Sequence, residues 1–338
     1  MSNIGAIAIG RNEGERLLRC LKSLIAQLPE GTPIVYVDSG STDNSVAMAK
    51  SLGVEIVELD MSLPFTMARG RNAGLKYLLE HFPNLKYVQF IDGDCEMIEG
   101  WVEKAIATLE SDEKLAIVCG RRRERFPDAS IYNRLAEMEW NTPVGEAKFC
   151  GGDAAIRITA IKQVNGYNES MICGEEPEMC IRLRQLGWKI WRIDADMTLH
   201  DAAMMEFNQW WKRSIRGGWA IAEGVAMHGK SPEQYMVRES FSRWTWGLIL
   251  PPMALVLAWP TWGLSLLLWI AYPILMWKVS RYRQSCGDLP SHARLYAFWC
   301  VVGKLPEAIG QAKYWLTRWQ NQEAKLIEYK KPAAASGS

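Results

Sequence analysis

The first 120 residues alternate short apolar runs with stretches of helical periodicity, and this alternation constrains the fold more than any other feature. The apolar runs predict strands at residues 4–9, 34–37, 54–59, 87–91 and 115–118. The stretches between them predict helices at residues 17–25, 43–52, 67–79 and 101–109. Strands that alternate with helices of this length form βαβ units with right-handed crossovers. The sequence therefore predicts an α/β fold with a doubly wound, mostly parallel sheet.

Polar residues follow three of these predicted strands. Gly10-Arg11-Asn12-Glu13 follows the first, Asp38 begins the polar segment after the second, and Asp92-Gly93-Asp94 follows the fourth. Asn12 is also a plausible cap for the first predicted helix. Ligands of open α/β sheets bind outside the carboxyl ends of the strands. We therefore expect the chemistry of this chain to lie just after Ile9, Val37 and Ile91.

The pair Asp92 and Asp94 is the most informative of these features. Two carboxylates separated by one glycine at a strand end point to the same spot, and like charges that close need a cation between them. A hard divalent ion needs few protein ligands when a substrate diphosphate supplies the others. The alternative is an ordinary polar turn. The chain contains no G-x-G-x-x-G after the first strand and no P-loop, which disfavours both a dinucleotide site and a P-loop site.

Charge and cysteine usage exclude other classes of protein. Lys and Arg total 39 against 38 for Asp and Glu, and a net charge of +1 gives no basic field for nucleic acid. The eight cysteines form no C-x-x-C pair, and they are expected to be reduced thiols in a cytosolic compartment. The N-terminus shows no basic segment or cleavage site of an export signal.

The C-terminal third points to a membrane. The chain has 16 Trp residues, and residues 244–277 contain no charged side chain, while Arg238, Arg243, Lys278 and Arg281 flank them. This pattern predicts a membrane hairpin that turns near Pro260 with both ends on the cytoplasmic side. A buried helix pair in a soluble domain is the alternative. Further apolar and aromatic residues at 296–302 and 308–319 suit amphipathic helices in the headgroup plane.

Several segments of the chain, in order, resemble the motifs of family-2 inverting glycosyltransferases with a GT-A fold. They are residues 7–13, 37–43, 68–74, 90–94, 151–153 and 174–178, the last followed by residues 182–188. The resemblance covers about residues 4–220. It implies a GT-A domain over residues 1–225, followed by a helical membrane-associated region at 226–330 and a tail at 331–338.

The resemblance also implies roles for particular residues on the donor side. Asp38 would read the nucleotide base, and Arg71 and Asn72 would lie against the nucleotide and its phosphates. Asp92 and Asp94 correspond to the D-x-D pair, with Asp94 as the more direct ligand of Mg²⁺ or Mn²⁺. Gly10, Asn12 and Glu13 belong to the first motif and are expected to line the donor site.

On the acceptor side, Glu175 and Glu176 occupy the place of the family's Glu-Asp pair. The second member would be the base that takes the proton from the acceptor hydroxyl. Glu176 is one methylene longer than the Asp it replaces. The alternative is that these glutamates only supply the negative first turn that a helix dipole favours.

Two further features have weaker support. His200 follows a strand-like segment and is either a third metal ligand, since neutral imidazole suits Mn²⁺, or a packed histidine. Arg213 and Arg216, three residues apart on a predicted helix, resemble a loop that closes over donor phosphates in membrane-bound relatives. A basic interfacial face is an equally good interpretation of these two arginines.

Taken together, the sequence predicts a metal-dependent inverting glycosyltransferase. Its donor would be a nucleotide-diphosphate sugar and its acceptor a lipid or lipid-linked molecule, at the cytoplasmic face of an inner membrane, as in cell-envelope glycan or glycolipid synthesis. The alternative is a non-catalytic nucleotide-sugar-binding subunit that uses the hairpin to recruit partners. Displacing a nucleoside diphosphate needs leaving-group neutralisation and one carboxylate base, and both are present in the pattern. The sequence does not indicate an oligomeric state.

Overall fold

The computed structural model describes residues 3–329, which form two compact units. A sheet unit covers residues 3–205, and a helical unit covers residues 206–329. The boundary lies at Glu206, which caps the first helix of the second unit, whereas the sequence analysis placed it at residue 225. The predicted tail at 331–338 lies outside the described residues.

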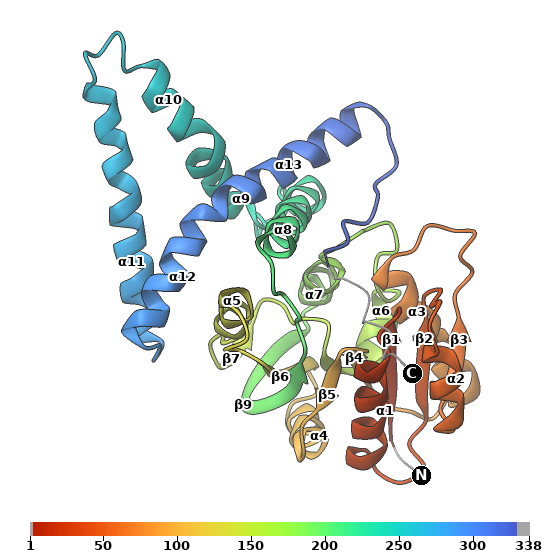
Figure 1. The fold of residues 1–338 in the computed structure, drawn as a ribbon. Coiled ribbons are helices and arrows are strands. Elements are labelled where there is room, and N and C mark those ends of the chain that lie inside the picture. The colour runs from red at the N-terminus through yellow and green to blue at the C-terminus, as the bar shows by residue number, and fades with distance from the viewer. Residues whose placement is uncertain (1–2, 330–338) are drawn as a thin grey trace. The chain divides into compact units, whose positions relative to one another are not determined.

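The sheet unit contains one mixed sheet with strand order β3-β2-β1-β4-β8-β6-β9-β5, and β7 pairs with β9 (Figure 1). The strands are β1 (Ile4–Gly10), β2 (Ile34–Asp38), β3 (Glu55–Glu58), β4 (Tyr87–Asp92), β5 (Cys95–Met97), β6 (Leu115–Glu124), β7 (Gly145–Ala147), β8 (Ala154–Arg157) and β9 (Lys189–His200). The five predicted strands are all confirmed.

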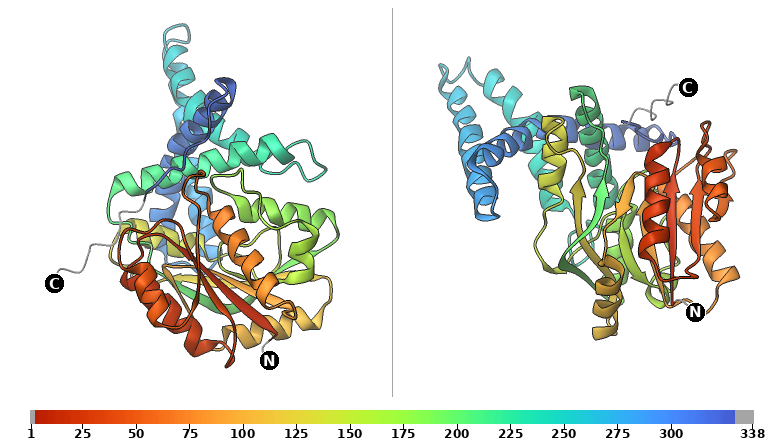
Figure 2. Two further views of the ribbon diagram at one scale, coloured as in Figure 1. Left: turned by 90° about the vertical axis from the view of Figure 1, so that its right-hand side faces the viewer. Right: turned by 60° about the horizontal axis from the view of Figure 1, so that its bottom comes forward.

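The helices of the sheet unit lie on both faces of the sheet, as the two views of Figure 2 show. They are α1 (Glu15–Gln27), α2 (Ser45–Ser51), α3 (Met67–His81), α4 (Trp101–Ser111), α5 (Ile131–Glu139), α6 (Ile158–Gln163) and α7 (Glu175–Gln185). The apolar strands β1, β2 and β4 are almost completely buried between these helices, as expected for parallel strands covered on both faces. Asn12 is not the cap of α1, because that helix begins after Gly14.

Strand pairing brings the polar strand ends together. Strands β1, β2 and β4 are parallel, with Gly10 opposite Asp38 and Ile9 opposite Asp92. Strand β6 runs parallel to β9, which places Glu124 opposite His200, and β5 runs antiparallel to β9, which places Cys95 opposite His200. One end of the sheet therefore brings together residues from six strands.

The second half of the sheet departs from the predicted parallel arrangement. Strand β8 is antiparallel to both β4 and β6, and the three-residue strands β5 and β7 are antiparallel to β9. These short strands lack an apolar run long enough to predict. The "mostly parallel" prediction therefore holds for β1 to β4 and for the pair of β6 and β9, whereas β5, β7 and β8 are antiparallel to their neighbours.

The helical unit begins with α8 (Phe207–His228) and α9 (Val237–Trp244). A hairpin follows, built from the π-helix η1 (Thr245–Ile249), α10 (Leu250–Val256), the 3-10 helix η2 (Leu264–Ile270) and α11 (Ala271–Ser285). The unit ends with α12 (Pro290–Val302) and α13 (Lys304–Trp319).

The hairpin exists, and it turns at residues 257–263, close to the predicted Pro260 (Figure 1). Across residues 3–329, no helix has the length and apolar character needed to cross a membrane. The transmembrane helix predicted from the uncharged stretch is therefore not found among the described residues. The hairpin nevertheless leaves large apolar side chains exposed, with Trp259 at 92% and Trp262 at 96%.

Candidate active site

Asp92 ends strand β4 between two arginines. Its Oδ1 lies 2.9 Å from Nη2 of Arg71, and its Oδ2 lies 3.1 Å from Nη2 of Arg122. Its backbone N–H donates to Oδ1 of the fully buried Asp153, which also pairs with Arg122 at 2.9 Å. Two guanidinium groups thus compensate the charge of Asp92. Asp92 is therefore a weaker candidate for metal ligation than Asp94.

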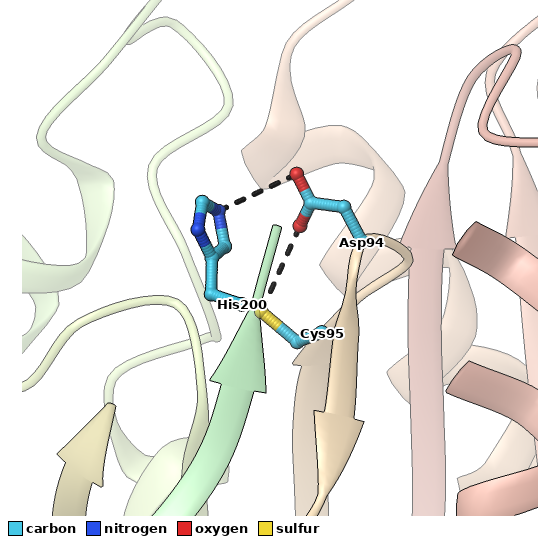
Figure 3. Close-up of side chains that lie close together, drawn as sticks. All are labelled: Asp94, Cys95 and His200. Carbon is cyan, nitrogen blue, oxygen red and sulfur yellow. Dashed lines mark hydrogen bonds and ion pairs between the residues drawn. The ribbon is translucent and has the colours of Figure 1, made fainter. Parts of the chain in front are cut away.

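Asp94 and His200 lie together, as the sequence predicts for metal ligands (Figure 3). Oδ2 of Asp94 lies 3.4 Å from Nε2 of His200, and both residues are buried. The Cys95 thiol donates to Oδ1 of Asp94 across 3.7 Å. Ligands at neighbouring positions of an octahedral ion with bonds of about 2.1 Å are about 3 Å apart. One carboxylate oxygen and one imidazole nitrogen at this separation therefore fit a divalent ion such as Mn²⁺.

The glutamate pair begins helix α7, directly after Gly174, which adopts the left-handed conformation with φ 83°. Oε1 of Glu175 lies 2.7 Å from Nη1 of Arg71, and Oε1 of Glu176 lies 3.0 Å from Nη2 of the same arginine. Glu178, in the same turn, forms a separate ion pair with Arg182. The first turn of α7 is acidic, yet two of its carboxylates converge on one buried cation.

Arg71 is the link between the D-x-D segment and the glutamate pair. It projects from α3, is 1% exposed, and binds Asp92, Glu175 and Glu176. A Cβ at Gly152 would lie 2.5 Å from Nη2 of Arg71, so this packing requires glycine there. The sequence predicts that Arg71 faces the nucleotide phosphates. Its guanidinium engages three carboxylates, and its contact with phosphates stays a prediction.

The environment of Glu176 raises the pKa of its carboxyl to about 7. Burial is the main cause, the neighbouring charge of Glu175 adds to it, and Arg71 acts in the opposite direction. A carboxylate with a pKa near the working pH is suited to accept a proton during catalysis. The side chain retains 15% exposure, so a substrate hydroxyl can reach it.

The loops that follow β1 and β2 are joined by hydrogen bonds. Oδ2 of Asp38 accepts from the N–H groups of Gly40 and Ser41, and its Oδ1 accepts from the Tyr36 hydroxyl. Asn12, with φ 55°, accepts from the Thr42 N–H at 2.7 Å, which joins the loop after β1 to the loop after β2. These bonds shape the segment that the sequence assigns to base recognition, and the base contact itself stays a prediction.

The remaining predicted donor residues are placed as follows. Glu13 pairs with Arg16 at 2.9 Å beside Gly10. Asn72 binds the backbone of Tyr167 through both its Oδ1 and its Nδ2, which fixes the loop before α7. The predicted contact of Asn72 with the nucleotide stays a prediction, since these hydrogen bonds go to Tyr167.

Arg213 and Arg216 lie on α8 in the helical unit, and their predicted closure over the donor phosphates stays a prediction.

Sequence reasoning missed three residues of this site, of which Glu124 and Asp153 are buried and Arg122 is half-buried. Arg122 and Glu124 belong to the charged end of β6, and Asp153 enters the sequence analysis only as part of the segment 151–153. The run Arg121-Arg122-Arg123-Glu124-Arg125 reads as a solvated charged face. Successive side chains of a strand point to opposite faces of the sheet, so Arg122 and Glu124 lie on the same face. This two-residue periodicity is the sequence signal that could have identified them.

Comparison with known proteins finds similarity to glycosyltransferases in the first half of the chain. Residues 7–166 match the family model described as glycosyl transferase family 2. The succinoglycan biosynthesis protein ExoA of Rhizobium meliloti is 27% identical over 54% of this chain and 58% of its own length. The O-antigen chain rhamnosyltransferase RfbN of Salmonella typhimurium is 24% identical over 46% of this chain and 53% of its own. The chain thus spans about half the length of these relatives.

Solved structures share the fold. The mannosyltransferase PcManGT of Pyrobaculum calidifontis matches with a TM-score of 0.53 at 17% identity, over 94% of this chain and 86% of its own. Residues 1–349 of S. aureus TarS match with a TM-score of 0.51 at 14% identity, over 94% and 92%. This likeness shows a GT-A-like mixed α/β fold, and residues 7–166 resemble family 2 glycosyl transferases.

Proposed function

We propose that this chain is a metal-dependent, inverting glycosyltransferase that moves a sugar from a nucleotide-diphosphate sugar to a lipid or lipid-linked acceptor. The observation that carries the proposal is the position of Arg71. Its guanidinium lies between Asp92 of the D-x-D segment and the carboxylates of Glu175 and Glu176. The donor-side carboxylates and the candidate base therefore belong to one connected site, as a transfer reaction requires.

The donor side of the site suits a diphosphate leaving group. Asp94 and His200 would hold Mg²⁺ or Mn²⁺, which when bound neutralises charge on the departing diphosphate. Two structural neighbours support this class of ligand: PcManGT was solved with GDP-Man and Mn²⁺, and TarS 1–349 with UDP-GlcNAc. Ion pairs with Arg71 and Arg122 fix the orientation of the Asp92 carboxylate at the proposed donor site.

The acceptor side has one candidate base. Glu176 is the more exposed member of its pair, and its pKa of about 7 suits a group that takes a proton from a hydroxyl. Glu175 is 2% exposed and fully engaged by Arg71, so we assign it to positioning and to raising the pKa of Glu176. Direct displacement with a single base inverts the anomeric centre.

We place the acceptor in a membrane. The relatives ExoA and RfbN act, by their names, in succinoglycan and O-antigen synthesis, which favours a cell-envelope glycan. The hairpin tip exposes Val256, Trp259, Trp262 and Leu264, and no charge lies between residues 244 and 277. Exposed Trp with basic residues nearby is typical of the membrane interface. The proposed location is the cytoplasmic face of the inner membrane.

A donor panel tests the catalytic proposal. The purified full-length chain should slowly hydrolyse one nucleotide-diphosphate sugar in the presence of Mn²⁺, and hydrolysis should stop in excess chelator. Glu176→Gln should lower kcat for transfer by about 100-fold or more. Glu178→Gln is the matched control, because Glu178 lies in the same helical turn but pairs with Arg182 instead of Arg71. Binding of nucleotide sugars with no turnover of any of them, by hydrolysis or transfer, would favour the non-catalytic alternative.

Vesicle flotation tests the membrane proposal separately. The Trp259→Ser/Trp262→Ser variant should lose most of its binding to vesicles that contain anionic lipid. Phe149→Ser, which removes an exposed aromatic ring from the sheet unit, should bind as the wild type does. Equal binding of all three proteins, or none by the wild type, would contradict insertion of the hairpin tip.

A further inference from the structure

We infer that Glu124 is a positioning residue for His200, and that it holds the imidazole with an Nδ1–H toward Glu124 and with Nε2 toward Asp94. The effect of Glu124 on metal binding rests on the proposed metal-dependent function. The contacts from which the inference is drawn are contacts between residues of this chain. The parallel pairing of β6 with β9 places Glu124 directly opposite His200. No sequence motif singled out Glu124.

The His200 imidazole lies between two carboxylates. Its Nε2 lies 3.4 Å from Oδ2 of Asp94, and its Nδ1 lies 3.5 Å from Oε2 of Glu124. A distance of 3.5 Å is long for a hydrogen bond, so the effect of Glu124 is mainly electrostatic. Glu124 favours an N–H on Nδ1, and Asp94 likewise favours an N–H on Nε2 until a divalent ion binds there. With the proton on Nδ1, Nε2 could then give its lone pair to an ion on the Asp94 side.

Glu124 itself cannot easily move. It is 4% exposed, and its Oε1 accepts from the Phe126 N–H at 3.1 Å and from the Asn133 side chain at 3.3 Å. Its Oε2 accepts from the Ala202 N–H at 3.1 Å, two residues beyond His200. The carboxylate therefore faces His200 from a position that three donors fix.

The other sides of the imidazole are also occupied. The Trp140 ring packs edge-on against it, with ring centroids 4.8 Å apart, and Cys95 is its cross-strand neighbour on β5. Trp140 in turn lies under the guanidinium of Arg122, the residue that pairs with Asp92. Carboxylates and aromatic packing of this kind commonly orient metal-binding histidines, and their loss typically costs 10–100-fold in metal affinity.

The test measures Mn²⁺ affinity and the His200 tautomer. In titrations followed by the EPR signal of free Mn²⁺, Glu124→Gln should weaken binding by about 10–100-fold. Glu137→Gln is the control, since Glu137 is buried and binds the Glu124 N–H, Arg121 and Arg123. It should cost stability while leaving Mn²⁺ affinity within about twofold.

A double-mutant cycle separates positioning from general damage. In the His200→Ala background, adding Glu124→Gln should change the Mn²⁺ affinity by no more than about twofold, because the residue it orients is gone. A further 10-fold loss in that background would overturn the inference and make Glu124 a purely structural residue.

A measurement on the unmutated protein keeps the inference testable even if Glu124→Gln folds poorly. The chain has four histidines, and long-range ¹H–¹⁵N spectra of histidine-labelled protein report which ring nitrogen carries the proton. His200→Ala assigns its signal. We expect a proton on Nδ1 in the metal-free wild type, whether or not Nε2 also carries one. A proton on Nε2 alone would refute the role of Glu124.

Discussion

The sheet unit and the helical unit use the same large apolar residues in opposite ways. Trp101 of the sheet unit is 1% exposed, and its indole N–H donates to Gln89 inside the core. Trp259 and Trp262 of the helical unit are 92% and 96% exposed. Trp101 therefore contributes to folding, whereas the apolar residues of the hairpin tip are available for a partner such as a lipid surface.

The largest contrast should appear in stability. Trp101→Ala removes a buried ring and a satisfied hydrogen bond, so it should lower the free energy of unfolding by about 3–5 kcal/mol. Trp262→Ala removes an exposed ring and should change it by no more than about 0.5 kcal/mol. Denaturant unfolding of both variants measures the difference. A large destabilisation by Trp262→Ala would mean that the hairpin tip packs on something within the folded chain.

The second contrast concerns activity, which should depend on the sheet-unit site. Asp94→Ala removes one proposed metal ligand and should lower the transfer rate by about 1000-fold, with little change in the unfolding transition. Full activity of this variant, or of the wild type in excess chelator, would remove the metal from the mechanism. Trp259→Ser should leave hydrolysis of a soluble donor unchanged.

A smaller effect should appear in the pH dependence. Because the pKa of Glu176 is about 7, the carboxyl is protonated below this pH and cannot accept a proton from the acceptor. The logarithm of kcat/KM should therefore rise with pH and level off above about 7, with a slope of about one below it. A rate that is constant from pH 5 to pH 8 would assign the base role to another group.

The sequence predicted the parts of this molecule whose signals are local. The strands β1, β2, β3, β4 and β6 follow from their apolar runs, and the proximity of Asp94 to His200 follows from the family resemblance. The sequence could not indicate that Arg71 binds Glu175, 104 residues away, because that contact depends on how α3 and α7 meet the sheet. Glu124 was missed because it ends a run of arginines.

The hairpin shows a different limit of sequence reasoning. Its composition predicted the turn near Pro260 correctly, but no helix on either side has the length and apolar character of a membrane span. A run of uncharged residues gives the polarity of a segment. It does not fix whether the backbone forms one long helix or several short ones, because prolines and a left-handed glycine, here Gly263, interrupt the run.

The central claim is that Glu176 is the base of a glycosyl transfer site. The most direct test measures kcat for transfer and the donor Kd on the same preparations of the wild type and Glu176→Gln, with Mn²⁺ present. The account predicts that kcat falls by about 100-fold or more while the donor Kd stays within about twofold. Unchanged kcat, or a donor Kd that weakens as much as kcat falls, would contradict it.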